Sequence, residues 1–498
     1  MDFSYPVALL LVLSFRAVQP LAWSYILYAT ICGSYSSWIL VLAACEAIFH
    51  VYHIHLSKIV SRPWRHGTGN LVQLQIAFTR VLKAGLANLH SDAERPGSPN
   101  ETITQLERND PRAADFRNVL RTWFGRVPFS EIRALEVRKW IYWSIFNTDL
   151  PRNLSAAHQA VLEDTLRQLE MRLGSNIVEG SNPNALPMRM TLDKVNISPR
   201  PFMLYLAVFC VNRCLRWYYR ARYDLRHGTH DGLEYLVYVP KDWNNETGPR
   251  PTVFFHGLGF GLLQYHFMLM DLLRFLPDRP LLVPLQPHIS QDIFHPHFLE
   301  PICRRELADR VAGLLHKLGW VDLELPTDDV SKDDGLPSGQ KGVTALSHSN
   351  GSYMHAWCLK AYPELFTRSC FADMVTVCLW EGDICHRFLY STPTTGFELL
   401  VRYFVGTELG TANLLCRNFD WSSNSLWFEE LPNARDPTKT LFLLGGKDTI
   451  INAHRVKKYL TSHGVREGLY FDEEAQHGDA LERGSKGHTL VLEWLRDN

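Results

Sequence analysis

The stretch Val343-Thr-Ala-Leu-Ser347-His348-Ser349-Asn350-Gly351-Ser352 is the most informative part of the sequence. Its apolar beginning predicts a strand, and Tyr353 to Ala361 has the composition of a helix. Between them lies a small-x-Ser-x-Gly pattern, in which Ser349 needs small neighbours because the two backbones nearly touch at such a turn. Ser347 stands where glycine is usual, and it is small enough to fit. We expect a tight turn that lifts the hydroxyl of Ser349 clear of a sheet.

Polar turns follow three other predicted strands. The strand Pro251 to Phe255 runs into His256-Gly-Leu258-Gly, Thr440 to Leu444 runs into Gly445-Gly-Lys-Asp448, and a last strand runs into Asp472-Glu-Glu-Ala-Gln-His477. Each pattern is weak when taken alone. The chain order Ser349, Asp448, His477, with every residue beyond the carboxyl end of a strand, indicates that these turns form one site.

Short apolar runs alternate with helical stretches from about residue 231 onward. The expected strands are Leu233–Val239, Thr252–Phe255, Leu281–Leu285, Val343–Leu346, Cys370–Val377, Thr440–Leu444 and Gly468–Phe471. Such alternation indicates an α/β fold with a mostly parallel sheet and helices on both faces. The gap from Val377 to Thr440 is too long for a simple crossover and contains a helical stretch, Phe397 to Leu415. It predicts an inserted helical cap at about 378–439.

Together these motifs resemble the α/β-hydrolase superfamily, over about Glu234 to Trp494. The resemblance implies a serine hydrolase in which Ser349 is the nucleophile, His477 the general base and Asp448 the acid that orients it. It assigns the oxyanion hole to the backbone N–H groups of Leu258 and Asn350. The implied chemistry is acyl transfer from an ester, thioester or amide carbonyl, and it requires no metal and no organic cofactor.

Other carboxylates compete with Asp448. Asp373 follows the strand after the nucleophile, where some members of the superfamily carry the acid, and it stays an alternative. Asp472 and Asp479 are too close in sequence to His477 to be the usual acid.

The remaining histidines have simpler expected roles. We expect His348 to point toward the sheet and His256 to hold the oxyanion turn by hydrogen bonds. His288, His295 and His297 lie close together, but no carboxylate keeps a convincing spacing with them. The sequence therefore predicts no metal site.

Composition excludes several classes of function. Hydrophobic residues make up 46% of the 498 residues, which suits a globular chain with a sizeable core. The net charge is −1, and without a basic excess we expect no nucleic-acid partner. The ten cysteines form no CxxC pair, which argues against a zinc site or a dense disulfide framework.

The N-terminus, residues 1–66, is expected to anchor the chain in a membrane. Apolar runs cover Val7–Phe15, Leu21–Ile31 and Tyr35–Tyr52, and a spanning helix needs about 20 such residues. A cleaved signal peptide is the alternative, but it would not explain Trp38 to Phe49. Lys58, Arg62 and Arg65 follow, so the catalytic part is expected to face the cytoplasm.

Residues 67–230 are expected to form a mainly helical accessory region, followed by the hydrolase domain at 231–498. Leu71–Leu89 and Leu154–Leu173 have helical periodicity, whereas Ser91–Pro111 and Asp322–Lys341 are polar and predict surface loops. Phe202 to Val211 runs into several arginines and aromatics. It predicts either a helix in the membrane interface or a buried helix.

The whole chain also resembles membrane-anchored fungal hydrolases, through its apolar N-terminus, helical segment and aromatic cap. The cap holds Phe388, Phe397, Tyr403, Phe404, Trp421 and Trp427 among others, which favours an apolar acyl pocket and a lipid-like ester substrate. An acyltransferase with the same residues and a non-catalytic scaffold of the same fold are the alternatives. The oligomeric state stays open.

Overall fold

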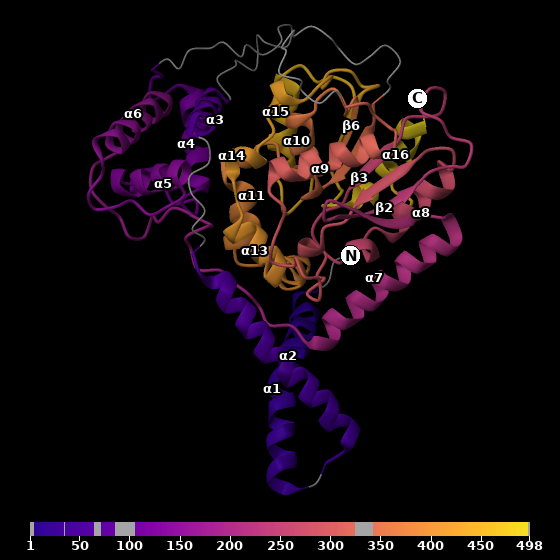
Figure 1. Cartoon of the computed structure of the whole chain (residues 1–498). Helices are drawn as coiled ribbons and strands as arrows, with labels where there is room; N and C mark the ends of the chain where they lie inside the picture. The colour runs from indigo at the N-terminus through magenta and orange to yellow at the C-terminus, as the bar shows by residue number, and fades with distance from the viewer. Residues whose placement is uncertain (1–3, 34, 64–70, 85–104, 324–341, 497–498) are drawn as a thin grey trace.

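The computed structural model describes residues 4–33, 35–63, 71–84, 105–323 and 342–496. Most of the two expected loops, 91–111 and 322–341, lies outside these residues, as does Arg65. Within them, a central sheet is covered by helices, a second group of helices packs at its side, and an apolar helical hairpin projects from the body (Figure 1).

The sheet has eight strands in the order β1-β2-β4-β3-β5-β6-β7-β8. The strands are β1 (Arg226–His230), β2 (Leu233–Tyr238), β3 (Thr252–Phe255), β4 (Leu281–Pro284), β5 (Thr344–His348), β6 (Arg368–Ala372), β7 (Thr440–Gly445) and β8 (Leu469–Asp472). β2 runs antiparallel to β1 and β4, and all other neighbours are parallel. The predicted, mostly parallel sheet is thus confirmed.

Helices cover both faces of the sheet, because the strands carry apolar residues on both sides that must be buried. α8 (His266–Phe275) and α16 (Lys486–Arg496) bury their apolar residues with Phe254 and Leu346 in one cluster. α9 (Arg304–Lys317), α10 (Gly351–Ala361) and α15 (Ala453–Ser462) pack on the other face, with Val253 and Phe255. Alternate residues of β3 therefore point into opposite layers, as a strand requires.

The helical region before the sheet shares its core with the second of these faces. It contains α3 (Leu71–Lys83), α4 (Pro111–Thr122), α5 (Ala134–Phe146) and α6 (Ala156–Leu173). Trp140, Trp143 and Leu169 of these helices belong to the same buried cluster as Val253 and Phe255. This region is therefore joined to the sheet layer by apolar packing.

The N-terminal apolar runs form two long helices, α1 (Tyr5–Cys32) and α2 (Ser37–Ser61). Pro20 lies inside α1, so the first two apolar runs are one helix. Both helices are long and apolar enough to cross a membrane by length and composition. α7 (Phe202–Tyr223) begins beside α2 and slopes away from it (Figure 1).

The segment between β6 and β7 is a cap of short helices. It contains α11 (Asp383–Cys385), α12 (Gly396–Val401), α13 (Leu409–Arg417) and α14 (Trp421–Asn424), with 3₁₀ or π turns between them. The expected single helix Phe397–Leu415 is broken at 402–408, where a π turn ends and Glu408 caps α13. The inserted cap itself is present.

Two strands differ from expectation for local reasons. β1 was not predicted because its sequence is polar. A polar sequence is possible there because β1 is a largely exposed edge strand. Asp231 and Gly232 join it to β2 with φ values of 47° and 82°, which a tight hairpin turn requires. The strand expected to reach Val377 ends at Ala372, because Asp373 turns the chain with φ 45°.

Candidate active site

Ser349 lies in a tight turn between β5 and α10. Its φ of 51° is unusual for a residue with a side chain and costs of the order of 1–3 kcal/mol, about as other strained functional turns do. A Cβ atom on Gly351 would lie 2.1 Å from the carbonyl oxygen of Phe255. One on Gly257 would lie 3.0 Å from the Cβ of Ser349. Glycine is therefore required at both positions for the strand, the helix and the turn to approach each other.

Ser347 occupies the place of the usual glycine without a clash. Its side chain is fully buried, and its hydroxyl lies 2.9 Å from Nδ1 of His355 on α10. Nε2 of His355 lies 3.0 Å from the hydroxyl of Ser369 on β6. The departure from glycine thus adds a polar link between β5, the following helix and the next strand.

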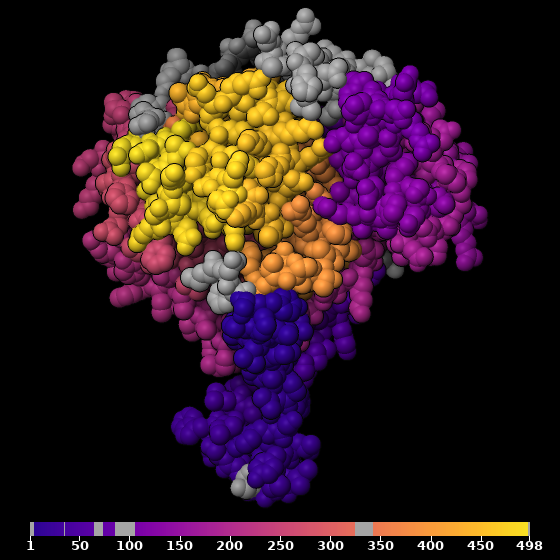
Figure 2. Space-filling view, turned by 180° about the vertical axis from the view of Figure 1, so that it is seen from behind, coloured from indigo at the N-terminus to yellow at the C-terminus, as the bar shows by residue number. Residues whose placement is uncertain are grey.

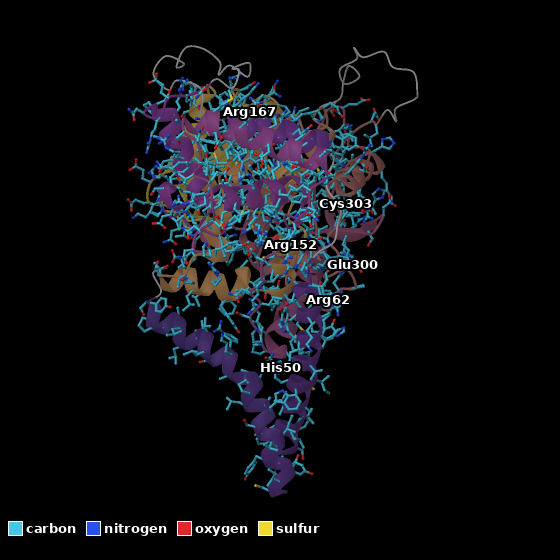
Figure 3. All side chains as sticks on the ribbon, turned by 90° about the vertical axis from the view of Figure 1, so that its left-hand side faces the viewer. His50, Arg62, Arg152, Arg167, Glu300 and Cys303 are labelled. Carbon is cyan, nitrogen blue, oxygen red and sulfur yellow. The ribbon has the colours of Figure 1, made fainter. Side chains whose placement is uncertain are left out.

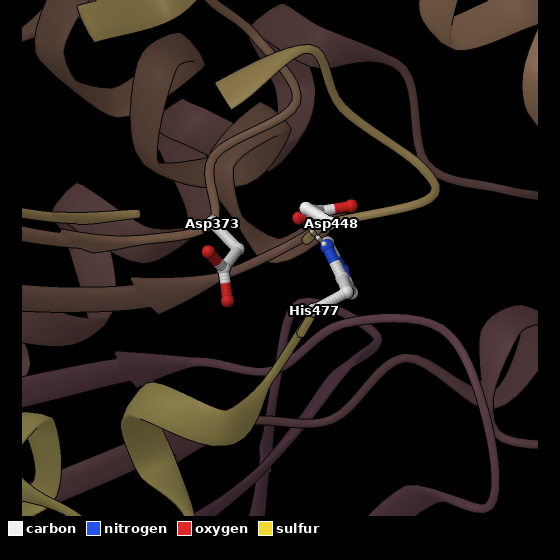
Figure 4. Close-up of side chains that lie close together, drawn as sticks. All are labelled: Asp373, Asp448 and His477. Atoms are coloured by element: carbon white, nitrogen blue, oxygen red, sulfur yellow. Dashed lines mark hydrogen bonds and ion pairs between the residues drawn. The ribbon is translucent and has the colours of Figure 1, made fainter. Parts of the chain in front are cut away.

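Ser349, His477 and Asp448 are joined by hydrogen bonds. Nε2 of His477 lies 2.8 Å from Oγ of Ser349, and its Nδ1 lies 2.6 Å from Oδ2 of Asp448. The other oxygen of Asp448 accepts backbone N–H bonds from Ile450 at 2.7 Å and Ile451 at 2.9 Å. Figure 4 shows the carboxylate facing the imidazole across the ends of β7 and β8. This is the geometry of a nucleophile, a base and an acid that orients the base.

Two backbone N–H groups beside Ser349 have no hydrogen-bond acceptor among the described residues. Within the described part of the chain, neither the amide of Leu258 nor that of Asn350 donates a hydrogen bond. On either side of Leu258, Gly257 donates to the Tyr265 hydroxyl at 2.8 Å and Gly259 to the carbonyl of Ile289 at 3.0 Å. The turn is therefore held by its neighbours while its central N–H stays available.

The turn after β5, together with the strand order and the inserted cap, decides the fold. It is the α/β-hydrolase fold. The sheet places Ser349 at the carboxyl end of a central strand, β5, with Asp448 after β7 and His477 after β8.

Several solved structures to which this chain is similar are hydrolases by name. A bacterial membrane phospholipase A is 15% identical, with a TM-score of 0.35, covering 59% of this chain and 92% of its own. An α/β-hydrolase from the sediment metagenome of the Mar Chica lagoon is 14% identical, with coverages of 55% and 98% and a TM-score of 0.31. A meta-cleavage product hydrolase from Pseudomonas fluorescens is 12% identical, with coverages of 55% and 97% and a TM-score of 0.36.

No protein-family model matches the sequence, and no curated protein matches it. At such low identity and TM-score, the solved structures tell nothing of substrate or residue roles. The strand order and the turn after β5 define the α/β-hydrolase fold of this chain independently of them.

Asp373, the alternative acid, is buried beside the same histidine but bonds elsewhere. Its carboxylate accepts the backbone N–H of Gly445 at 3.0 Å and that of Gly478 at 2.7 Å. Burial, opposed by the charge of His477 and reinforced by that of Asp448, raises the pKa of Asp373 to about 6. Asp373 therefore ties the acid turn to the base loop, whereas Asp448 makes the direct bond to His477.

Asp373, Asp448 and His477 also form the one group in the described residues whose ligand atoms are close enough for a metal ion. All four carboxylate oxygens already accept hydrogen bonds: three of them from four backbone amides, and the fourth from the His477 ring. An ion would have to displace the bond between His477 and Asp448. The donor set fits an acid–base pair better than a metal centre.

The charge state of His477 gives a first testable prediction. Burial lowers its pKa, but the charge and hydrogen bond of Asp448, with the charges of Asp373 and Asp479, raise it to about 9. A general base must be neutral, so we expect kcat/KM for any substrate to rise with pH through about 9. A pH profile of kcat/KM from pH 6 to 10.5, in a constant-ionic-strength buffer, measures this.

The same pKa shift has a stability consequence of opposite sign. Because the folded pKa is raised from 6.5, the charged His477 stabilises the folded chain below pH 6.5, and this contribution is lost as pH rises to about 9. A kcat/KM profile already flat above pH 7 would contradict the strong coupling between His477 and Asp448.

Two buried histidines support the turn after β3. His256 does so by hydrogen bonds, as predicted, whereas His348, which was expected to point toward the sheet, lines the cavity beside Ser349. His348 has Nδ1 2.7 Å from the hydroxyl of Tyr265, which in turn accepts the N–H of Gly257. The hydroxyl proton of Tyr265 therefore goes to His348, whose Nδ1 is unprotonated. Nδ1 of His256 lies 3.0 Å from the Gly257 carbonyl, and its Nε2 accepts from the amide of Gln286 at 3.3 Å. Burial lowers the pKa of both histidines, which keeps them neutral.

The histidine group after β4 has carboxylate partners that its sequence did not reveal. Nε2 of His295 lies 3.4 Å from Glu234 on β2, and Nδ1 of His297 lies 3.0 Å from Glu300. Arg216 also contacts Glu234, at 3.2 Å. No carboxylate was expected at a convincing spacing from these histidines; Glu300 follows His297 by three residues, and sheet pairing brings Glu234 of β2 close to His295. A guanidinium on the same carboxylate makes this an ion-pair cluster.

A cavity of about 540 Å³ opens over Ser349. Its apolar lining comes from the oxyanion turn, α8 and the cap, and includes Leu258, Phe260, Tyr265, Phe267, Met268, Val375, Ile384, Phe388, Phe397, Val401, Val405 and Leu415. Of the cap aromatics singled out by sequence, only Phe388 and Phe397 line it. The others pack elsewhere, as Trp427 does in stacking on Trp380 at 4.0 Å. The apolar character of the cavity is therefore shared between cap and sheet.

One supporting contact was missed by sequence reasoning. Arg455, on the helix after the acid turn, bonds both carboxylate oxygens of Asp115 on α4 at 2.7 Å and Glu381 at 2.9 Å. Burial, opposed by Arg455, raises the pKa of Glu381 to about 7. The accessory helices thus buttress the turn that carries Asp448. No local pattern pairs residues so far apart in sequence.

Proposed function

We propose that this chain is a membrane-associated serine hydrolase that cleaves a lipid-like carboxylic ester through an acyl-enzyme on Ser349. The observation that carries the proposal is the continuous hydrogen-bonded chain from Ser349 through His477 to Asp448 at the floor of an apolar cavity. Two unpaired backbone amides beside the serine support it.

In the proposed mechanism, His477 takes the proton of Ser349 as its Oγ attacks the ester carbonyl. The N–H groups of Leu258 and Asn350 stabilise the oxyanion, and one such donor is typically worth about 2.7–4 kcal/mol of barrier. Asp448 holds the Nδ1 proton of His477 and stabilises the imidazolium. His477 then protonates the leaving alcohol, and water releases the acyl group by the same steps.

Cavity and anchor together favour a lipid-like substrate. A cavity of about 540 Å³ with a mostly apolar lining suits an acyl chain better than a charged or sugar-like group. Two exposed apolar helices at the N-terminus would keep the chain at a bilayer, where such esters reside. Lys58, in the last turn of α2, predicts that the catalytic part lies on the cytoplasmic side.

A series of p-nitrophenyl esters from acetate to palmitate tests the substrate class. We expect kcat/KM to rise at least about tenfold from the acetyl to the octanoyl ester, because each buried methylene is worth about 0.8 kcal/mol until the cavity is filled. Replacing Val401 of the cavity lining with tryptophan should shift the optimum to shorter chains. Equal kcat/KM on acetate and palmitate would contradict an acyl-binding cavity.

A further inference from the structure

The helices α1 and α2 leave the folded body at defined places. On α1, Arg16 reaches the Ser198 hydroxyl at 3.2 Å, and Gln19 donates to the carbonyl of Arg200 at 2.9 Å. On α2, Glu46 accepts the amide of Phe202 at 2.8 Å. These three bonds end on one short segment of the body, 198–202, so the described residues between them, 20–33 and 35–45, form the projecting hairpin.

This hairpin, residues 20–45, has an apolar exposed surface and no charge. Its large exposed residues are Leu21, Trp23, Leu27, Tyr28, Ile31, Tyr35, Trp38, Ile39, Val41 and Leu42. Figure 2 shows the hairpin standing free of the body below the cap. In Figure 3, Arg62, which directly follows α2, lies nearer the body than His50 does. So large an apolar surface marks a membrane or protein contact.

Several polar groups among the described residues of the hairpin are hydrogen-bonded within it or at its base. The amide of Ser36 donates to the Tyr25 hydroxyl at 2.9 Å, and Thr30 donates to the carbonyl of Ile26 at 2.8 Å. Trp23 donates to His50 across the two helices at 3.1 Å. Polar groups that are hydrogen-bonded within the protein suit a lipid environment, because hydrocarbon offers no hydrogen-bond partners.

The two arms of the hairpin are too short to cross a bilayer. At about 1.5 Å per residue, 20–32 extends about 20 Å and 37–45 about 14 Å beyond the body, against a hydrocarbon thickness of about 30 Å. The body at 198–202 carries Arg200 and the charged partners Arg16 and Glu46. It therefore stays at the surface, and the tip stops near the middle of the membrane.

We propose that residues 20–45 enter one leaflet of a lipid bilayer and return, so that the chain is held by a hairpin and crosses nowhere. This proposal rests on the membrane attachment in the proposed function, and it specifies how deeply the N-terminal helices enter the membrane. It replaces the expected spanning helices by a re-entrant anchor, with both ends of the hairpin on the side of the catalytic body.

α7 adds a second surface for the same leaflet at the base of the hairpin. Five of its exposed positions form a stripe at helical spacing: Met203, Ala207, Cys210, Cys214 and Trp217. The exposed Arg213 and Arg220 lie beside this stripe. An exposed apolar stripe flanked by arginines suits the headgroup boundary, where such helices lie in the plane of the surface.

Labelling at Cys32, the exposed last residue of α1, tests the geometry. Cys45, Cys210, Cys214 and Cys303 are changed to serine, Cys32 is labelled with NBD, and the full chain is bound to preformed phosphatidylcholine–phosphatidylserine vesicles. We expect the chain to float with the vesicles. The NBD label should be protected both from dithionite added outside the vesicles and from dithionite trapped inside them. Nitroxides placed deep in the acyl chains should quench its fluorescence. A matched chain that keeps only Cys303 among the exposed cysteines should be bleached from outside.

The outcomes distinguish the one-leaflet proposal from membrane attachment itself. Bleaching of Cys32 by trapped dithionite alone would mean that the hairpin crosses, and it would overturn the one-leaflet proposal while leaving membrane attachment intact. A vesicle-bound chain whose Cys32 label is bleached from outside would also overturn it. Failure of the unaltered, folded chain to float would instead remove the membrane part of the proposed function.

A charge on the hairpin gives a second readout that needs no label. Leu27→Glu with Trp38→Glu should lower vesicle binding by about tenfold or more, because charge is costly within hydrocarbon. The control Val178→Glu places a charge on an exposed apolar residue beside α5, far from the hairpin. It should leave binding unchanged. Equal binding by both variants would contradict insertion of the hairpin.

Discussion

Replacing Ser349 with alanine is expected to lower kcat on the best ester of the series by about 10⁵–10⁶-fold, with no change in fold. The reason is that Oγ of Ser349 is the atom that His477 reaches at 2.8 Å, and its removal ends the acyl-enzyme route. His477→Ala should cause a loss of similar size. Because the two act as a unit, the double variant should be hardly slower than either single one.

The comparison of Ser349→Ala with the unaltered chain needs a control serine substitution outside the candidate active site. Ser462, whose hydroxyl donates to the Tyr459 carbonyl at the end of α15, provides it, and Ser462→Ala should keep full activity. Circular dichroism and thermal unfolding check that each variant is folded. A folded Ser349→Ala chain that keeps more than about a tenth of the activity would contradict the mechanism.

Replacing Asp448 with asparagine should lower kcat by about 10⁴-fold, the second largest effect. The carboxylate accepts the Nδ1 proton of His477 at 2.6 Å, and asparagine can place its amide there instead, which favours the wrong tautomer. Asp373→Asn should act differently, because Asp373 accepts two backbone N–H groups and makes no hydrogen bond to the histidine. It should lower kcat by no more than about tenfold and lower stability by about 1–3 kcal/mol, since one N–H loses its acceptor.

The pair of variants decides between the two acids that the sequence left open. Steady-state kcat and the free energy of unfolding are measured for both under the same conditions. The pH profile adds a separate signature, since loss of Asp448 should move the apparent pKa of His477 downward. If Asp373→Asn proves the more damaging to kcat and leaves stability unchanged, the role of acid belongs to Asp373.

Sequence reasoning predicted the fold from local signals. Strand periodicity and turn residues are properties of neighbouring positions, so β2, β3, β4, β5, β7 and β8 could be placed within about two residues. The turn around Ser349 could also be anticipated, because the glycine at 351 and the small residue at 347 are required by close backbones. The edge strand β1 was not predicted, because an exposed edge strand needs no alternation of apolar and polar residues.

Contacts between distant segments could not be predicted. Nothing near Asp373 in sequence indicates that it would tie Gly445 to Gly478, and nothing near Arg455 points to Asp115. The proposed one-leaflet anchor also could not be predicted from the sequence. Apolar run lengths alone predict spanning helices, and only the bonds of Arg16 and Glu46 to the body indicate how little of each helix projects.

Labelling by a fluorophosphonate probe tests the central claim most directly, because the probe reacts only with a serine that is activated by a base and faces an oxyanion hole. The unaltered chain in detergent should be labelled, with the modified peptide carrying Ser349. Ser349→Ala and His477→Ala should abolish labelling, and Ser462→Ala should not. Absence of labelling in a folded, unaltered chain, or labelling that survives in Ser349→Ala, would contradict the account.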